Sequence, residues 1–262
     1  MKRNTNRFLL YFLFISALSF AQNSTINKAG KNEVAAAHKV LLIPFEQRLY
    51  LSEIDHHINA ETKLNARQIK HTFRDALNEQ IFKAFKSIRY NVTDLMEDTV
   101  KYKKDLESVY QYLNYDYQKV PDQNNYKPPV HEKGQKTIEK GQISVETDLE
   151  ARFMNAKMSD TKVMQSLSGK YRCDLFVYVN QLFIKAAGST VPGEFADPKA
   201  DRSIIVHYTV YTKEMKEINS GIAETKFEYT LNNPKKISEK YFSKIGQMIA
   251  ERTQKALEPP KK

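Results

Sequence analysis

Residues 66–96 read ARQIKHTFRDALNEQIFKAFKSIRYNVTDLM, and this stretch decides the fold class. Its apolar side chains recur at steps of three and four from Ile69 to Ile88, which predicts an amphipathic helix over 66–88. Asn65 stands where an N-terminal helix cap is expected. The residues that follow the helix, 89–96, predict a strand.

A strand is also predicted before this helix. Residues 38–46, HKVLLIPFE, form a short apolar run that Pro44 stops, which is typical of a buried strand ending in a loop. Strand, helix and strand in this order imply a right-handed crossover between two parallel strands.

The carboxyl-terminal half of the sequence predicts three further strands of the same sheet and two more helices. Residues 159–171 predict a short capped helix that leads into a central strand at 173–187, CDLFVYVNQLFIKAA. Residues 202–212, an NSG turn at 219–221 and the alternating residues 222–230 predict an antiparallel hairpin with solvent on one side, so that His207 is half-exposed. A last helix is predicted from about Ser238 to Leu257.

The fold class predicted is therefore α/β (α+β), with a single mixed sheet, a parallel strand-helix-strand start, a C-terminal antiparallel hairpin and packed helices. One α/β domain is expected over 38–258, with a long insertion at about 97–158. The first part of the insertion keeps helical spacing as far as Tyr117. Residues 121–142 are rich in proline, glycine and lysine, which favours an extended, mobile loop, and order is expected to return at Ser159.

The amino terminus predicts export. Lys2, Arg3 and Arg7 precede an apolar run at 8–20 and a small residue, Ala21, which is the order of a cleavable signal peptide over 1–21. A flexible leader is expected at 22–37. We expect the mature chain to lie in the periplasm, or to be secreted or associated with the outer membrane, and to contain no transmembrane helix.

Cysteine count and charge narrow the function classes. The only cysteine, Cys173, cannot form an intrachain disulfide and is expected to be a buried small hydrophobe. The formal net charge is +10, and the three basic residues of the signal peptide leave +7 for the mature chain. This charge favours an anionic glycan or lipid surface as a neighbour, whereas the scattered lysines argue against nucleic acid.

No catalytic motif is evident. The sequence contains neither a G-x-S-x-G elbow nor a G-x-x-x-x-G-K phosphate loop, and HEKGQ at 131–135 lacks the second histidine of a zinc-protease helix. No catalytic residue and no cofactor are predicted.

One polar loop follows the first strand, at the edge where open sheets place binding sites. Its candidate partner-binding residues are Ser52, Glu53, Asp55, His56 and His57, with Glu61 nearby. Three of these, Asp55, His56 and His57, are the weak candidates for a metal site. Because adjacent histidines are expected to point apart, contact with a partner is the preferred interpretation.

Six tyrosines crowd into the insertion, and tyrosine is enriched at interfaces. Four of these tyrosines are candidate partner-binding residues, namely Tyr110, Tyr112, Tyr115 and Tyr117. The remaining two tyrosines are Tyr102 and Tyr126. Packing of the insertion onto its own domain is an equal alternative, and stacking on sugars is a third.

The order of elements resembles a family of envelope proteins that includes the amino-terminal domain of TolB, CsgG and LpoB. The resemblance rests on KVLLIPF at 39–45, on residues 77–88 followed by YNV, and on LSGKYRCDLFVYVNQL at 167–182. It implies a docking module that binds another envelope protein. The leading hypothesis is a non-enzymatic docking or adaptor module of the envelope; the alternative is a metal-dependent hydrolase or a glycan-binding protein acting on an envelope polymer.

Overall fold

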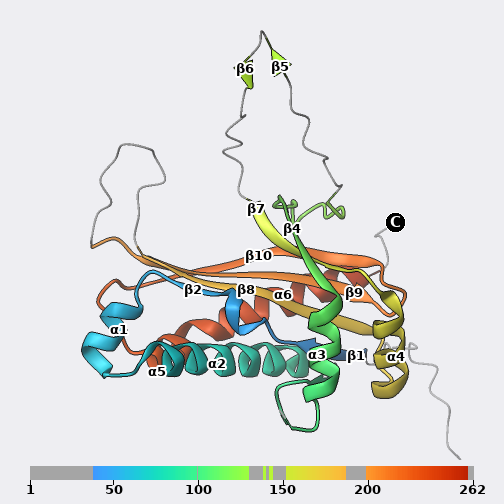
Figure 1. Cartoon of the computed structure of the whole chain (residues 1–262), viewed down its shortest axis with the longest axis horizontal. Coiled ribbons are helices and arrows are strands. Elements are labelled where there is room, and N and C mark those ends of the chain that lie inside the picture. The colour runs from blue at the N-terminus through green and yellow to red at the C-terminus, as the bar shows by residue number, and fades with distance from the viewer. Residues whose placement is uncertain are drawn as a thin grey trace, which may run out of the picture. The chain divides into compact units, whose positions relative to one another are not determined.

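A computed structural model of the chain describes residues 38–98, 100–129, 138–139, 142–143, 152–186 and 199–258. The predicted signal peptide, the leader and much of the predicted mobile loop lie outside the described residues. The described part has a mixed sheet with helices and a C-terminal antiparallel hairpin, which confirms the predicted fold class (Figure 1).

The main sheet has the strand order β10-β9-β8-β1-β3, and a short strand, β2, also pairs with β8. Its strands are β1 (Lys39–Ile43), β2 (Tyr50–Ser52), β3 (Asn91–Asp94), β8 (Leu175–Lys185), β9 (Arg202–Thr212) and β10 (Glu217–Phe227). β1 runs parallel to both β3 and β8, whereas β8, β9 and β10 are antiparallel in succession. The predicted parallel pair and hairpin are both confirmed.

Four helices pack on one face of this sheet. They are α1 (Asp55–Thr62), α2 (Ala66–Ser87), α5 (Pro234–Ile237) and α6 (Ser243–Leu257), with a π-helical turn at Ser238–Phe242 between the last two. α2 begins with a capping box, in which Asn65 accepts from the Gln68 amide and Gln68 accepts from the Asn65 amide. The predicted helix boundary and cap are confirmed.

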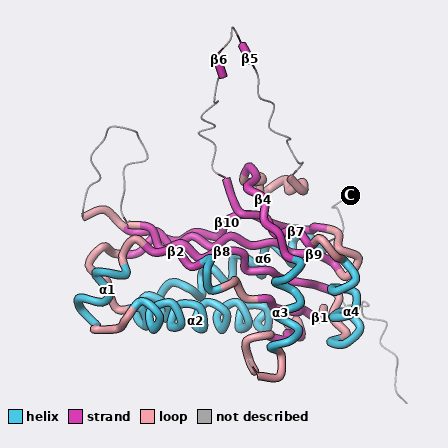
Figure 2. The backbone as a smooth tube through the Cα atoms, viewed as in Figure 1, coloured by secondary structure: helices cyan, strands magenta, loops and turns pink. Residues whose placement is uncertain are grey.

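The other face carries α3 (Lys103–Tyr112), α4 (Thr161–Tyr171) and a two-stranded arm, β4 (Leu113–Lys119) paired with β7 (Arg152–Met158). The arm lies on the side of the sheet opposite α2 (Figures 1 and 2). A 3₁₀ turn (Gln47–Leu49) precedes β2, and the two-residue strands β5 (Ile138–Glu139) and β6 (Gln142–Ile143) pair with each other. Cys173 is buried in the core under α3 and α4, as predicted.

The insertion differs from its prediction in two respects. The helix ends at Tyr112 instead of continuing to Tyr117, and the chain then turns into β4. Order returns at Arg152 and not at Ser159, because Phe153 and Ala156 of β7 are fully buried. The arm is therefore part of the packed structure.

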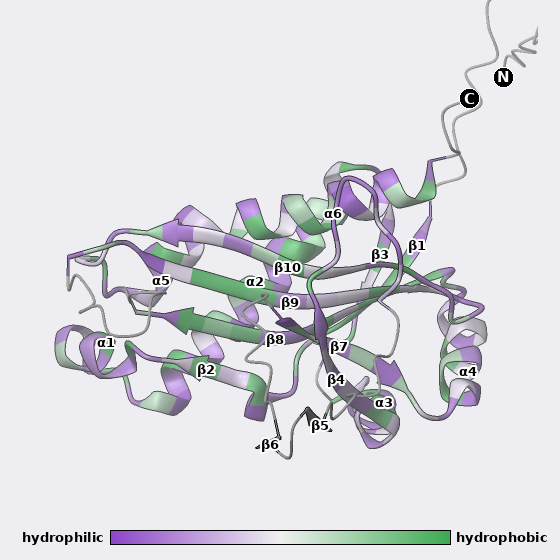
Figure 3. Cartoon of the chain, turned by 90° about the horizontal axis from the view of Figure 1, so that it is seen from above, coloured by the Kyte–Doolittle hydropathy of each residue, from purple (hydrophilic) through white to green (hydrophobic). Residues whose placement is uncertain are grey.

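A bulge at Asn180 changes which residues of β8 face the helices on either side of it. Before it, Val177 and Val179 face α2, and after it Leu182 and Ile184 do, so the facing parity reverses at the bulge. The hydrophobic middle of the sheet along β8 and β9 and the more hydrophilic β4 are visible in Figure 3.

Two expectations about the hairpin are wrong. The turn lies at 213–216, where Met215 has a positive φ, while Asn219, Ser220 and Gly221 continue β10. His207 is only 6% exposed, because β7 crosses over this face of the hairpin. Among the helices of the described part, none is both long and apolar enough to cross a membrane.

Candidate functional site

The predicted polar loop at 52–61 is mostly a helix. Ile54 and Ile58 are fully buried and four residues apart, which places Asp55–Thr62 on the sheet as α1. Glu53 joins two elements, because its amide donates to the Ile184 carbonyl and its carboxylate accepts from the Ala186 amide at 2.8 Å. Ser52 accepts from the Ile54 amide. Both side chains have local structural roles.

The three weak metal candidates do not gather around a common point. The Asp55 carboxylate accepts a hydrogen bond from the Tyr50 hydroxyl at 2.7 Å. His56 and His57 are exposed, with ring centroids 3.9 Å apart, so the expectation that they point apart is wrong. Slight desolvation of its ring, with a smaller contribution from the neighbouring His56, lowers the pKa of His57. Across the described ranges, no three His, Cys, Asp or Glu side chains are grouped so as to hold a metal ion.

Most of the insertion's tyrosines pack onto the domain itself. The Tyr110 hydroxyl donates to the Pro44 carbonyl at 2.6 Å and accepts from Arg74, and burial raises its pKa to about 12. Tyr115 is largely buried beside Glu46, and burial raises its pKa strongly. Tyr112 is half-buried. Tyr117 differs, because 56% of it is exposed.

The arm is fixed to the sheet by side chains that bond to its backbone. The amides of Met154 and Ala156 donate to His207 Nδ1 and Thr209 Oγ1 at 2.9 and 3.1 Å. The carbonyls of the same two residues accept from Asn180 and Tyr211. The edge of β7 that faces the sheet is thereby satisfied without a neighbouring strand, since a buried backbone group needs a partner.

A buried carboxylate on β10 holds the arm and the segment that follows β4. Glu217 is 7% exposed and pairs with Lys157 of β7 at 2.8 Å. It also accepts from the hydroxyls of Tyr126 and Ser220 at 2.8 and 2.7 Å. Such a charge is tolerated when it is paired and hydrogen-bonded, so Glu217 fixes both segments at once.

Gly221 allows the same segment to approach β10. Its φ is +142°, and a Cβ at this position would lie 2.8 Å from Gln123 Nε2. Gln123 donates to the Ser220 carbonyl at 2.7 Å and accepts from Asn219. Residues 121–126 are therefore anchored at the strand that the sequence pattern suggested was a turn.

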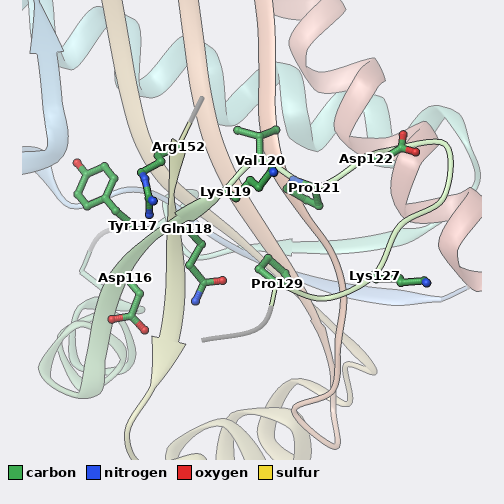
Figure 4. A pocket seen from close by; sticks show the side chains of 10 residues that line it. All are labelled: Asp116, Tyr117, Gln118, Lys119, Val120, Pro121, Asp122, Lys127, Pro129 and Arg152. Carbon is green, nitrogen blue, oxygen red and sulfur yellow. The ribbon is translucent and has the colours of Figure 1, made fainter. Parts of the chain in front are cut away.

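The arm and the anchored segment enclose a hollow of about 500 Å³, which we call the arm hollow. It is lined by Asp116, Tyr117, Gln118, Lys119, Val120, Pro121, Asp122, Lys127, Pro129 and Arg152. Tyr117 and Arg152 lie on the side of the arm, and Asp122 and Lys127 come from the returning segment (Figure 4). Three basic and two acidic side chains give the hollow a small positive excess.

Gln118 is the buried polar group of the arm hollow. It is 6% exposed, and its Oε1 accepts from Asn155 at 3.3 Å. Its Nε2 has no hydrogen-bond partner among the residues that the structure describes. A buried donor of this kind costs free energy unless a ligand or water completes it, so it favours an acceptor within the hollow.

No family model matches the chain, and no curated protein is significantly similar to it. The functional conclusion therefore depends on the geometry of the arm hollow and on the predictions from sequence.

Of the predicted site residues, the structure places only Tyr117 at the arm hollow. Sequence reasoning missed Gln118, Lys127 and Arg152. β4 pairs with β7 across residues 120–151 of the chain, and this pairing brings Lys119 opposite Arg152. One signal was present: four of the seven residues in RFMNAKM at 152–158 are apolar, which is compatible with a buried strand.

Proposed function

We propose that this chain is an exported, non-enzymatic docking module of the cell envelope that binds its partner through the surface around Tyr117 and the arm hollow. Export is supported by the amino-terminal sequence, and the docking role is supported by the resemblance to the envelope-protein family. Neither source names the partner.

The observation that carries the proposal is the contrast between Tyr117 and the other tyrosines of the insertion. Tyr102, Tyr110 and Tyr115 are buried or half-buried against the domain, whereas Tyr117 is 56% exposed on β4, whose backbone pairs with β7. A large ring on a rigid support loses little conformational entropy on binding, which is the usual character of an interface anchor.

The charges around Tyr117 indicate the chemistry of the partner. Lys119, Lys127 and Arg152 outnumber Asp116 and Asp122, and the unpartnered Gln118 Nε2 adds a donor. Carboxylate-bearing side chains are the natural complement to donors of this kind. We therefore expect an acidic segment of an envelope protein at this surface.

Cross-linking in intact cells of the native host tests the proposal. The tagged mature chain is treated with an amine-reactive cross-linker, and attached proteins and linked positions are identified by mass spectrometry. The expected result is one recurrent envelope protein linked through Lys119 or Lys127. Tyr117→Ala should reduce the yield at least about tenfold, as expected for an anchor worth more than 1.4 kcal/mol. Links only to random neighbours, or an unchanged yield with Tyr117→Ala, would contradict it.

A glycan is the second candidate ligand, favoured by the exposed aromatic ring of Tyr117. It is distinguished by titrating purified mature protein with soluble envelope polymer. Glycan binding through Tyr117 would appear as saturable binding lost on Tyr117→Ala but not on Glu224→Gln, a surface change on β10. Absence of saturation would remove this candidate.

A further inference from the structure

A second hollow lies at the opposite edge of the sheet from β10, between α2 and the end of β3. It measures about 350 Å³ and is lined by Asp75, Asn78, Glu79, Phe82, Asp94, Met96 and Glu97. We call it the edge hollow. Four of its lining side chains are carboxylates and none is basic, whereas the mature chain as a whole carries a formal charge of +7.

Asp94 forms the floor of the edge hollow. It is 9% exposed and accepts from the Met96 amide at 2.8 Å and from Asn78 Nδ2 at 2.5 Å. Burial raises its pKa, although these two hydrogen bonds oppose the rise. Arg74 acts on Asp94 only from a distance, because its guanidinium donates to the Phe45 carbonyl and the Tyr110 hydroxyl.

Asn78 supplies an observation that is independent of the carboxylates. It is 2% exposed, it lines the edge hollow, and its Oδ1 has no hydrogen-bond partner within the described residues. An orphaned buried acceptor is costly, so its presence beside a hollow calls for a donor from outside. No described residue donates to this oxygen, and the two lysines that contact lining residues are engaged elsewhere: Lys83 pairs with Glu79 at 2.6 Å, and Lys86 lies over the Phe82 ring.

A bare metal ion does not fit this arrangement. Within the part of the chain that the structure describes, no three acidic or histidine side chains converge closely enough to hold one. The carboxylates are spread around the hollow, and Phe82 presents an aromatic ring that accepts cations, as the Lys86 ammonium 5.7 Å from its centroid shows. An extended organic cation with several N–H donors satisfies spread carboxylates, an amide oxygen and a ring together.

We propose that the edge hollow binds a basic side chain, lysine or arginine, presented by the partner protein. This inference rests on the proposed docking function and names a second contact, separate in its residues from the arm hollow. The bound ammonium or guanidinium group pairs with Asp94 and donates to Asn78 Oδ1, while its alkyl stem lies along Phe82 and Met96.

The test uses the mature chain with ¹³C-labelled methionine methyl groups. It contains six methionines, of which Met96 lines the edge hollow and the buried Met164 lies in the core of the other face. The probes are N-acetyl-lysine methylamide and N-acetyl-arginine methylamide, and N-acetyl-norleucine methylamide is the uncharged control. We expect a saturable shift of Met96 with a basic probe, with Kd about 1 mM for one charged side chain, and none of Met164.

Matched variants separate this site from general charge attraction. Asp94→Asn should raise Kd at least about tenfold, as for loss of one member of a buried charge pair, whereas Glu224→Gln on β10 should leave it unchanged. The milder, exposed variant Glu97→Gln should raise Kd about two- to threefold, so the test does not depend on Asp94→Asn being folded. The inference would be overturned by an equal Met96 shift with the norleucine probe or by no Met96 shift with either basic probe. An unchanged Kd in both Asp94→Asn and Glu97→Gln would also overturn it.

Failure of this inference is distinguishable from failure of the docking proposal. Tyr117→Ala changes no residue of the edge hollow, so it should leave the Met96 titration unchanged. A partner cross-linked at the arm together with a silent Met96 would retain docking and remove the basic-side-chain contact.

Discussion

His207 shows how a single side chain fixes a strand that has no neighbour on one edge. Its Nδ1 accepts from the Met154 amide, so this nitrogen must be unprotonated, and burial lowers the pKa of His207 to about 4. Protonation would turn His207 Nδ1 into a donor that faces the N–H of Met154, so the hydrogen bond would be lost. The contact between arm and sheet is therefore sensitive to acid.

The pH dependence of stability follows from this imidazole. The unfolded chain binds the proton near the ordinary pKa of about 6.5, whereas the folded protein binds it only near pH 4, so acid favours unfolding. The free energy of unfolding should fall by about 2 kcal/mol from His207 alone between about pH 7 and pH 5. Urea denaturation of the wild type and His207→Gln at both pH values measures the difference. Equal losses in the two proteins would refute the assignment.

Gly221 and Gly169 form a matched pair. Gly221→Ala places a Cβ 2.8 Å from Gln123 Nε2 on a backbone with φ +142°, whereas a Cβ at Gly169 of α4 meets nothing within 4 Å. We expect Gly221→Ala to destabilise by about 1–3 kcal/mol and Gly169→Ala to stabilise by up to about 1 kcal/mol. Thermal unfolding measures both. A tolerated Gly221→Ala would contradict the anchoring of residues 121–126 at this strand.

At the scale of elements, the arm depends on a polar layer between two sheets of unequal size. Thr209 Oγ1 accepts from the Ala156 amide and from Asn180, and donates to Asn155. One hydroxyl therefore joins β7, β8 and β9. Because this layer is buried and nearly complete, we expect the arm to unfold only with the main sheet.

Thr209→Val tests that coupling. It keeps the shape but leaves the Ala156 amide and the polar atoms of Asn155 and Asn180 short of partners, which should cost about 2–3 kcal/mol. Amide hydrogen exchange at Ala156 should accelerate strongly. Thr253→Val is the control, since the buried Thr253 hydroxyl bonds only to the Ile249 carbonyl one helical turn away. If both variants lost equal stability and exchange at Ala156 stayed slow, the polar layer would not fix the arm.

The elements with strong hydrophobic periodicity were predicted correctly. β1, α2, β8, β9 and α6 each bury an apolar face on the main sheet, and their spacing is visible in the sequence. The arm was missed because much of its contact with the main sheet is made by polar side chains. Asn155, Gln118 and Glu217 are buried by pairing with one another, a relation that no local pattern contains.

The misplaced turn at Asn219–Gly221 has the same cause. Asparagine, serine and glycine together usually mark a turn, but here their polar groups bond to Gln123 and Tyr126 from the insertion. The glycine serves close approach instead of reversal of the chain. Tertiary partners nearly a hundred residues away in sequence decided the local structure.

The candidate site was predictable only in part. Sequence reasoning selected Tyr117 among nine candidates but could not distinguish it from Tyr110 or Tyr115, because the burial of those two depends on tertiary neighbours such as Pro44 and Glu46. Export was inferred from residues that the structure does not describe, and it stays a prediction.

At the scale of the whole molecule, the two hollows have opposite character. The arm hollow carries a positive excess beside an exposed ring, and the edge hollow is acidic over a buried Asn78 oxygen. A partner that presents an acidic segment to the arm hollow and a basic side chain to the edge hollow would be held in a single orientation. Complementary charges fix how two proteins align, and they also speed their association.

Docking through the arm around Tyr117 can be tested in cells of the native host by placing a photo-activatable amino acid at position 117. The same residue at position 213, on the exposed turn between β9 and β10, is the control. We predict one dominant adduct with an envelope protein from position 117 and none of it from position 213. Adducts of equal yield and identity from both positions, or no adduct from position 117, would contradict the account.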